Sequence, residues 1–290
     1  MSATSSATEA HSVDPSANGP PAPPARPILV RKMGFDFTDV PRHWFGGSGL
    51  MTHMANGLNM VFPEGERFFI RSVKHYMSAI ADDPELVARC RAFFGQEGSH
   101  GHEHEKAFGF LERQGFEIRE WLQWYESTAF NHLERRLPPN LRLAVTAALE
   151  HLTATLAAEG LTTDHLDSAH PVMRELLRWH ACEEIEHKSV AFDVLQRVDD
   201  RYWVRVSGLC VGLASLLFYW RSAARMLLKQ DGIGKAQIKK ERRAARARGH
   251  NRNHLWRGFV EYLRPGFHPD DNDNYALASR YLEKIGRLAG

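Results

Sequence analysis

Apolar residues recur at helical spacing through the middle of this chain, from Leu50 to about Leu195. Side chains three or four positions apart share one face of a helix, whereas a half-buried strand alternates apolar and polar residues. No run of alternating strands is visible in this part of the sequence. Of all its features this periodicity constrains the fold most, and it predicts an all-α protein.

Four long helices are expected, and a proline near the start of each is typical of the first helical turn. They are predicted to begin at Pro63, Pro84, Pro139 and Pro171. Residues 115–137 form a long connection between the second and third helices, with a short helix of their own around Trp121. Four long helices with one long crossover are typical of a ferritin-like four-helix bundle.

The chain divides into three parts. Residues 1–27 are rich in Ser, Ala and Pro and hold almost no large apolar side chain, so we expect a disordered tail that is not a signal peptide. Residues 28–200 are expected to form the bundle. Residues 201–290 supply additional C-terminal helices, namely an apolar helix, a basic segment and an extension that pack on the bundle.

Glutamates and histidines interrupt the apolar stripes of the expected helices. Two Glu-x-x-His pairs occur, Glu97–His100 and Glu184–His187, and side chains three positions apart can grip one ion from one helix face. The helices before them place Glu66 on an apolar face and Glu150 in a nearly uncharged run. The order Glu, Glu-x-x-His, Glu, Glu-x-x-His is the ligand set of di-iron and di-manganese carboxylate bundles.

Electrostatics favour metal ions at this constellation. Four ionised carboxylates in one apolar core are too costly without positive charge, and two divalent cations supply it. Nitrogen and carboxylate ligands without thiolate suit iron, with manganese or zinc as alternatives. The competing interpretation is a buried ion-pair network in which Arg67, Lys106 or Lys188 neutralises the carboxylates.

Further histidines lie on the same helix faces. His104 follows His100 by four positions, and His180 precedes Glu184 by four. One of them is expected to be an extra ligand or to orient a ligand, and we take Glu97, Glu184, His104 and His180 as the candidate catalytic residues. The neighbouring residues that fall off the stripes are expected to face solvent; they are His102, Glu103, Glu183 and Glu186.

Composition excludes several classes of protein. The formal net charge is only +2, which argues against a nucleic-acid binder. The three cysteines are widely spaced, which excludes a disulfide framework and a cysteine zinc site and indicates the cytoplasm. The sequence leaves open whether the chain is a monomer or a homodimer.

Five blocks of the sequence resemble a bacterial family catalogued as predicted metal-dependent hydrolases. They are FPEGERFF (62–69), GQEGSHGHEH (95–104), ALEHLT (148–153), WHACEEIEHKSVAFDV (179–194) and YLRPGFHP (262–269). The resemblance spans about residues 28–275. It implies a metal site at Glu66, Glu97, His100, Glu150, Glu184 and His187, with His104 and His180 as further candidates.

Two enzymatic functions follow from a carboxylate-rich metal site. The first is an O₂-dependent di-iron oxidase or oxygenase acting on a small apolar or lipid-like substrate, with an electron donor that the sequence does not identify. The alternative, which is also the catalogued activity, is a two-metal hydrolase of an ester, amide or phosphoester. Iron storage or a purely structural metal ranks third.

Residues 206–257 raise the separate question of a membrane. Residues 206–220 carry no charge, but as a helix they span only about 22 Å, less than a bilayer core of about 30 Å. Residues 221–257 hold twelve Lys or Arg residues against two acids. In one interpretation, residues 206–220 form a buried helix and residues 221–257 form a solvated basic arm. The other is a contact with an anionic membrane, which would place this cytoplasmic protein at the inner face of that membrane.

Overall fold

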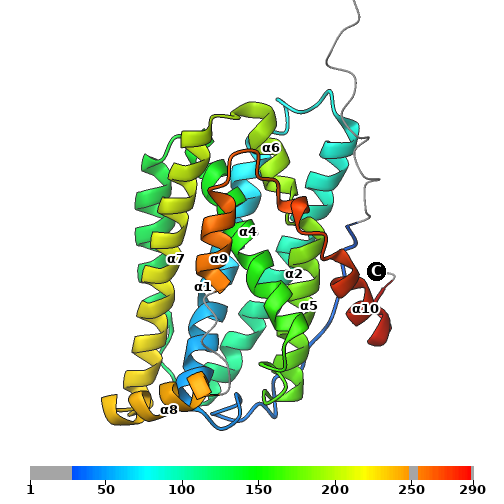
Figure 1. The fold of residues 1–290 in the computed structure, drawn as a ribbon. Helices are drawn as coiled ribbons and strands as arrows, with labels where there is room; N and C mark the ends of the chain where they lie inside the picture. Colours follow the sequence, from blue (N-terminus) through cyan, green and yellow to red (C-terminus); the bar gives the residue numbers. More distant parts are fainter. Residues whose placement is uncertain (1–27, 248–253, 289–290) are drawn as a thin grey trace, which may run out of the picture.

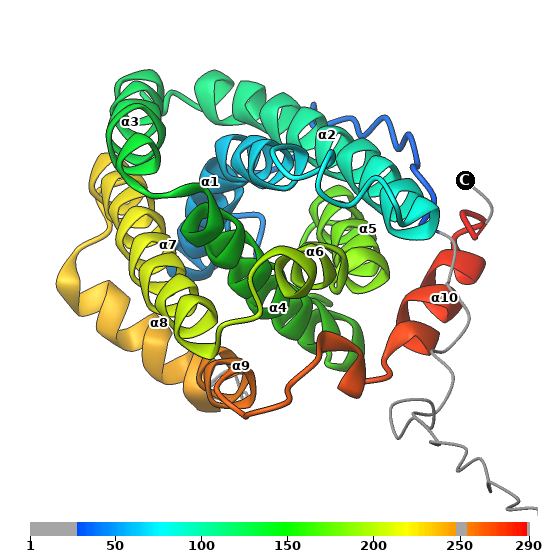
Figure 2. The same ribbon diagram turned by 90° about the horizontal axis from the view of Figure 1, so that it is seen from above.

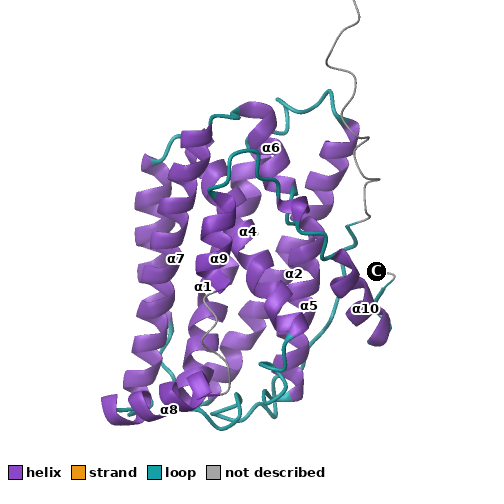
Figure 3. Cartoon of the chain, in the orientation of Figure 1, coloured by secondary structure: helices purple, strands orange, loops and turns teal. Residues whose placement is uncertain are grey.

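The computed structural model describes residues 28–247 and 254–288, and helices dominate these ranges (Figure 3). Within them Phe45 and Ala169 form an isolated β-bridge, and there is no strand. The all-α class is therefore confirmed, while the more specific ferritin-like arrangement stays a prediction. The expected tail at residues 1–27 lies outside the described part of the chain.

Six helices build the body of the molecule (Figure 1). They are α1 (Gly49–Lys74), α2 (Pro84–Arg113), α4 (Pro139–Thr162), α5 (Pro171–His187), α6 (Val190–Val198) and α7 (Tyr202–Gln230). The crossover and the C-terminal part contribute α3 (Arg119–Tyr125), the π-helix η1 (Glu126–Glu134), α8 (Lys235–Ala247), α9 (His254–Tyr262), the 3₁₀-helix η2 (Pro269–Asp271) and α10 (Tyr275–Lys284).

Three of the four expected helix starts are correct. Asp83 caps α2 by accepting a 2.9 Å hydrogen bond from the backbone N–H of Leu86, and Pro84 occupies the first turn. Pro139 and Pro171 likewise occupy the first turns of α4 and α5. Proline fits there because the first backbone N–H groups of a helix have no partner within it.

The prediction that Pro63 opens the first helix is wrong. α1 begins at Gly49, where Ser48 accepts a hydrogen bond from the backbone N–H of Met51, and Pro63 lies inside the helix. An internal proline removes one helical hydrogen bond and costs about 3 kcal/mol. Buried side chains on both sides of it, such as Met60 and Phe69, keep the helix continuous because tertiary packing outweighs that cost.

The helix expected from Pro171 through Val194 is interrupted after His187. α5 ends there, Lys188 and Ser189 follow, and α6 begins at Val190. The buried stripe nevertheless continues into α6, where Ala191 and Val194 are fully buried.

α7 packs lengthwise against α1 and α4 (Figure 2). Glycines allow the close approach: a methyl group on Gly208 would lie 2.4 Å from the backbone carbonyl carbon of Ala144, and one on Gly57 would lie 2.8 Å from the backbone nitrogen of Ala224. The expected apolar stretch 206–220 is therefore the middle of a 29-residue bundle helix. α7 is long and apolar enough to cross a membrane, and only 28% of its most apolar window is buried.

Two apolar clusters enclose the middle of the bundle. One contains Met60, Phe110 and Trp179, and the other contains Phe69, Phe93 and Leu143. Ring contacts tie both clusters to histidines between them, since Trp179 lies against His100 and Phe93 against His187. The polar residues of the predicted site are thus held at the centre of the molecule.

Candidate metal centre

The six predicted metal-binding residues lie on four helices that surround one point of the core. Glu66 projects from α1, Glu97 and His100 from α2, Glu150 from α4, and Glu184 and His187 from α5. None of the six is more than 5% exposed. Residues far apart in the sequence are therefore brought together without contact with bulk water.

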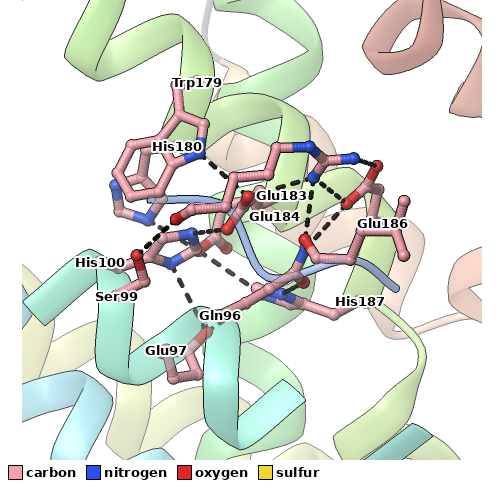
Figure 4. A network of polar contacts seen from close by, with 12 residues as sticks. Gln96, Glu97, Ser99, His100, Trp179, His180, Glu183, Glu184, Glu186 and His187 are labelled. Atoms are coloured by element: carbon pink, nitrogen blue, oxygen red, sulfur yellow. Dashed lines mark hydrogen bonds and ion pairs between the residues drawn. The ribbon is translucent and has the colours of Figure 1, made fainter. Parts of the chain in front are cut away.

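Short distances join these side chains, and Figure 4 shows the ones that come from α2 and α5. His187 Nε2 lies 3.1 Å from Glu97 Oε1, 3.2 Å from Glu150 Oε2 and 3.6 Å from Glu184 Oε1. His100 Nδ1 lies 3.9 Å from Glu97 Oε1 and 3.8 Å from Glu184 Oε1. Ligand atoms of Glu66, Glu97 and His100 lie within 4.8 Å of one another, and so do those of Glu97, Glu184 and His187.

Many of these donor atoms have no hydrogen-bond partner among the described residues. They are both carboxylate oxygens of Glu66, Glu97 and Glu150, Oε2 of Glu184, Nδ1 of His100 and Nε2 of His187. Buried polar atoms are almost always paired, because an unpaired one costs about 1–3 kcal/mol. A convergent group of unpaired carboxylate and imidazole donors fits metal ions well.

The competing ion-pair interpretation is wrong for this site. Arg67 pairs with Glu64 and Glu105 near the surface, and Lys106 pairs with Glu103. Lys188 is buried but donates to Asn272 and Asn274. Among the described residues, no lysine or arginine forms an ion pair with Glu66, Glu97, Glu150 or Glu184.

A buried carboxylate that the sequence analysis missed orients His100. Glu183 is fully buried and accepts a 3.0 Å hydrogen bond from His100 Nε2, which leaves Nδ1 directed at the centre. Trp179 Nε1 and the Arg31 guanidinium donate to the other oxygen of Glu183, at 2.9 and 3.1 Å. Burial raises the pKa of Glu183 to about 7, although Arg31 opposes the shift.

An amide orients His187 in the same way. Gln96 Oε1 accepts a 2.8 Å hydrogen bond from His187 Nδ1, so that Nε2 faces the three glutamates. The Gln96 side chain is itself fixed, because its Nε2 donates to Glu186 Oε2 at 2.7 Å. Such partners of a metal-binding histidine set its tautomer and orientation.

The expectation that the off-stripe residues form a solvated face is partly wrong. His102 is exposed, but Glu183 is fully buried and Glu103 is 4% exposed. Glu103 accepts hydrogen bonds from the backbone N–H groups of Gly34 and Phe35. The cause is the segment before α1, which covers this side of α2 and α5 and supplies Arg31. In the sequence, the only indication of these buried positions was that Glu183 directly precedes Glu184 and that Glu103 directly precedes His104.

His180 and His104 extend the cluster outward from Glu184. His180 Nε2 lies 2.8 Å from Glu184 Oε1 and 3.8 Å from Glu66 Oε1, so His180 is placed as an extra ligand would be. His104 Nε2 lies 2.6 Å from His180 Nδ1, and His104 Nδ1 lies 2.5 Å from Asn59 Oδ1. The three side chains form a continuous buried hydrogen-bonded chain.

His151, the neighbour of Glu150, does not face the centre. Its Nε2 hydrogen-bonds the backbone carbonyl of Gly258, and its ring stacks on Tyr262.

Without a metal the charges of the centre are strongly perturbed. Burial and the neighbouring carboxylates hold the pKa of Glu66 and of Glu97 well above the usual range, and burial raises that of Glu150 to about 7. Burial alone would raise the pKa of Glu184 and lower that of His187. Contacts with His180 and His187 instead hold Glu184 low, and contacts with Glu150, Glu184 and Glu97 hold His187 high.

An apolar pocket opens beside the centre. Its walls come from α1, the α3–η1 segment, α4 and α7, and they include Phe62, Phe69, Tyr125, Phe130, Leu216 and Tyr219. Glu66 and Glu184 also line it, so the pocket reaches the donor cluster. A site of this kind accepts an apolar molecule and presents one end of it to the polar groups.

A family model described as a predicted metal-dependent hydrolase matches residues 29–273. No curated protein and no solved structure matches the chain. The matched range includes every residue of the centre and of the pocket.

Proposed function

Since the chain belongs to the family of predicted metal-dependent hydrolases, we propose that it is a metal-dependent hydrolase of an apolar ester or amide. One observation carries the proposal. A buried cluster of unpaired carboxylate and imidazole donors lies at the inner end of an apolar pocket. The family description itself names the activity as a prediction, so the reaction has to be tested directly.

We assign the metal ligands to the six residues of the centre, with His180 as an additional ligand. The proposed occupants are two ions of iron, manganese or zinc, because all the donors are carboxylates and imidazoles. Bound ions of this kind polarise a carbonyl group and make water acidic enough to act as a nucleophile near neutral pH. Glu97 and Glu184 each lie near two histidines of the centre and would hold the ions together with them.

The chain's other groups position the substrate and its protons. The aromatic walls of the pocket bind the apolar part of the substrate and exclude water around it. The second ring nitrogen of His180, Nδ1, contacts His104. Through this 2.6 Å contact His180 would pass a proton to or from His104. Asn59 fixes the ring of His104.

The second candidate is an O₂-dependent oxidation of an apolar substrate by a di-iron centre. It is favoured by the donor set, since four glutamates with histidines inside a helix bundle are typical of di-iron carboxylate proteins. The apolar pocket would serve such a substrate equally well. The family description favours hydrolysis, which is why we place oxidation second.

Metal analysis of the purified protein, followed by two activity assays, separates the candidates. The first assay follows cleavage of nitrophenyl esters of increasing chain length by protein loaded with zinc or manganese under anaerobic conditions. The second follows O₂ consumption by iron-loaded protein with a reductant. Anaerobic cleavage that increases with chain length would support the hydrolase. Oxygen uptake without any ester or amide cleavage would contradict it and favour oxidation, and a protein that binds no metal would contradict both.

A further inference from the structure

One side of α7 is exposed along the whole helix. Positions three or four apart form the exposed stripe, which runs through Trp203, Ser207, Cys210, Ala214, Phe218, Arg221 and Arg225. Trp203 is 74% exposed and Phe218 is 59% exposed, which is unusual for such large apolar side chains. On the described part of the neighbouring α9, Trp256 and Val260 are exposed as well.

A basic helix lies beside this stripe. α8 runs outside the lower end of α7 (Figures 1 and 2) and has no buried residue. Its exposed cations are Lys235, Lys239, Lys240, Arg242, Arg243 and Arg246. Arg221 and Arg225 continue the positive charge onto α7.

α8 is anchored to the bundle, so these cations are held in place. Its single carboxylate, Glu241, accepts hydrogen bonds from the Ser48 hydroxyl at 2.6 Å and from the backbone N–H of Leu50 at 2.8 Å. Ile238 packs against Leu50 and Leu228. The acidic residue and the apolar residue thus face inward while the cations face outward.

We propose that the exposed stripe of α7, together with α8 and the exposed residues of α9, docks onto a membrane rich in anionic phospholipid. We refer to these three parts as the docking face. A face that carries both exposed tryptophans and clustered Lys and Arg is typical of surfaces that lie in the headgroup region. α7 lies on the membrane and does not cross it, because its other side is packed against α1 and α4.

Two other occupants fit the docking face less well. In a two-fold dimer the same patch meets itself, so the positive charges of α8 and Arg221 from both copies would be brought into one interface. A nucleic acid would use the cations but would leave the apolar stripe exposed to water.

The docking face also adjoins the pocket. Val211, Ser215 and Tyr219 of α7 line the pocket, and Phe218, on the exposed stripe, lies 5.0 Å from Tyr219 between ring centroids. If the proposed function is correct, an apolar substrate would pass from the bilayer along this edge into the pocket. Docking itself does not depend on the metal chemistry.

Vesicle flotation of the full chain tests the proposal. Vesicles of phosphatidylcholine alone are compared with vesicles in which about one third of the lipid is phosphatidylglycerol. We expect binding to the anionic vesicles only, and weaker binding at high salt because salt screens exposed charges.

Two sets of variants locate the surface. Each cation near an anionic surface is worth about a fivefold change in partitioning, so replacing four of them by glutamine should weaken binding by roughly several hundredfold. The four are Lys239, Lys240, Arg242 and Arg243. The matched control replaces Arg91, Arg280, Lys284 and Arg287, which are exposed elsewhere, and should bind like the parent. Trp203→Ser combined with Trp256→Ser should also weaken binding, whereas Leu288→Ser should not.

The results separate docking from catalysis. No flotation with anionic vesicles at low salt, or equal loss in the α8 variant and its control, would overturn the docking proposal. The docking proposal would also be overturned if light scattering showed a dimer that the Trp203→Ser substitution dissociates. Metal content and cleavage of a water-soluble ester are measured on the same variants, and both should match the parent. If no preparation, the parent included, binds metal or cleaves the ester while docking is intact, the proposed function is contradicted and the docking proposal is not.

Discussion

At the scale of single residues, the four buried glutamates destabilise the folded state unless a cation accompanies them. Each carboxylate has lost its hydration, and most of their oxygens have no donor. Contacts with the neighbouring imidazoles hold the pKa of Glu184 below its usual range, whereas the pKa values of Glu66, Glu97 and Glu150 are raised.

The first prediction concerns the proposed ligands. Glu97→Gln removes a charge and a ligand while keeping the shape of the side chain, so we expect most of the bound metal to be lost and the helical content to remain. Metal analysis and circular dichroism measure the two quantities. Glu105→Gln changes a half-buried glutamate of the same helix that lies outside the centre and should keep its metal. Equal metal content in the two variants would show that Glu97 is not a ligand.

The second prediction concerns Glu183. Partners that orient a metal-binding histidine typically contribute a factor of about 10–100 in metal affinity, so Glu183→Gln should weaken binding by that amount with little loss of helix. Competition with a chelator gives the affinity. Glu175→Gln, an exposed position of α5, is the matched control. Unchanged affinity in Glu183→Gln would show that the 3.0 Å contact with His100 has no part in binding.

At the scale of elements, glycines decide how closely the helices approach. Gly101 of α2 looks unfavourable for a helix in the sequence, since glycine costs about 1 kcal/mol relative to alanine. In the structure a methyl group there would lie 3.2 Å from Glu66 Oε2. The glycine therefore leaves room for the carboxylate of the neighbouring helix.

The third prediction concerns the contact between α4 and α7. Gly208→Ala would place its methyl group within 2.5 Å of backbone atoms of Ala144, which cannot move aside as a side chain can. We expect the free energy of unfolding to fall by about 1–3 kcal/mol. Urea denaturation measures it. Ser207→Ala, on the exposed stripe, should change it by about 0.5 kcal/mol or less, and a similar value for both variants would contradict the close contact.

At the scale of the whole molecule, the metal-free centre links stability to pH. The folded pKa values of Glu66, Glu97 and His187 are held well above their usual ranges, and that of Glu150 is raised to about 7. A group whose pKa is raised on folding binds its proton more tightly in the folded state. The stability that it contributes is present at low pH and is lost as the pH rises through the folded pKa.

The fourth prediction follows from this linkage. The melting temperature of metal-free protein should fall as the pH rises from about 7 to 9, because Glu150 and its neighbours then ionise without a partner. Glu184 and the buried His100, His104 and His151 do not reverse the trend, since their lowered pKa values keep Glu184 ionised and the histidines neutral over this range. Adding metal should raise the melting temperature most at the upper end of this pH range. A metal-free melting temperature that rises with pH would contradict the arrangement of charges.

The sequence by itself determined the helical class, three of the four helix starts and the inward direction of the six proposed ligands. These depend on spacings of three or four residues and on local capping, which are properties of short segments. Only the tertiary structure decided which side chains serve the histidines. Glu183 was expected to face solvent and is instead buried under Arg31, a residue 152 positions away. It likewise decided that α1 continues through Pro63 and that α7 is a bundle helix with one exposed side. Those outcomes depend on which distant segments pack against a helix, and helical periodicity holds no information about that.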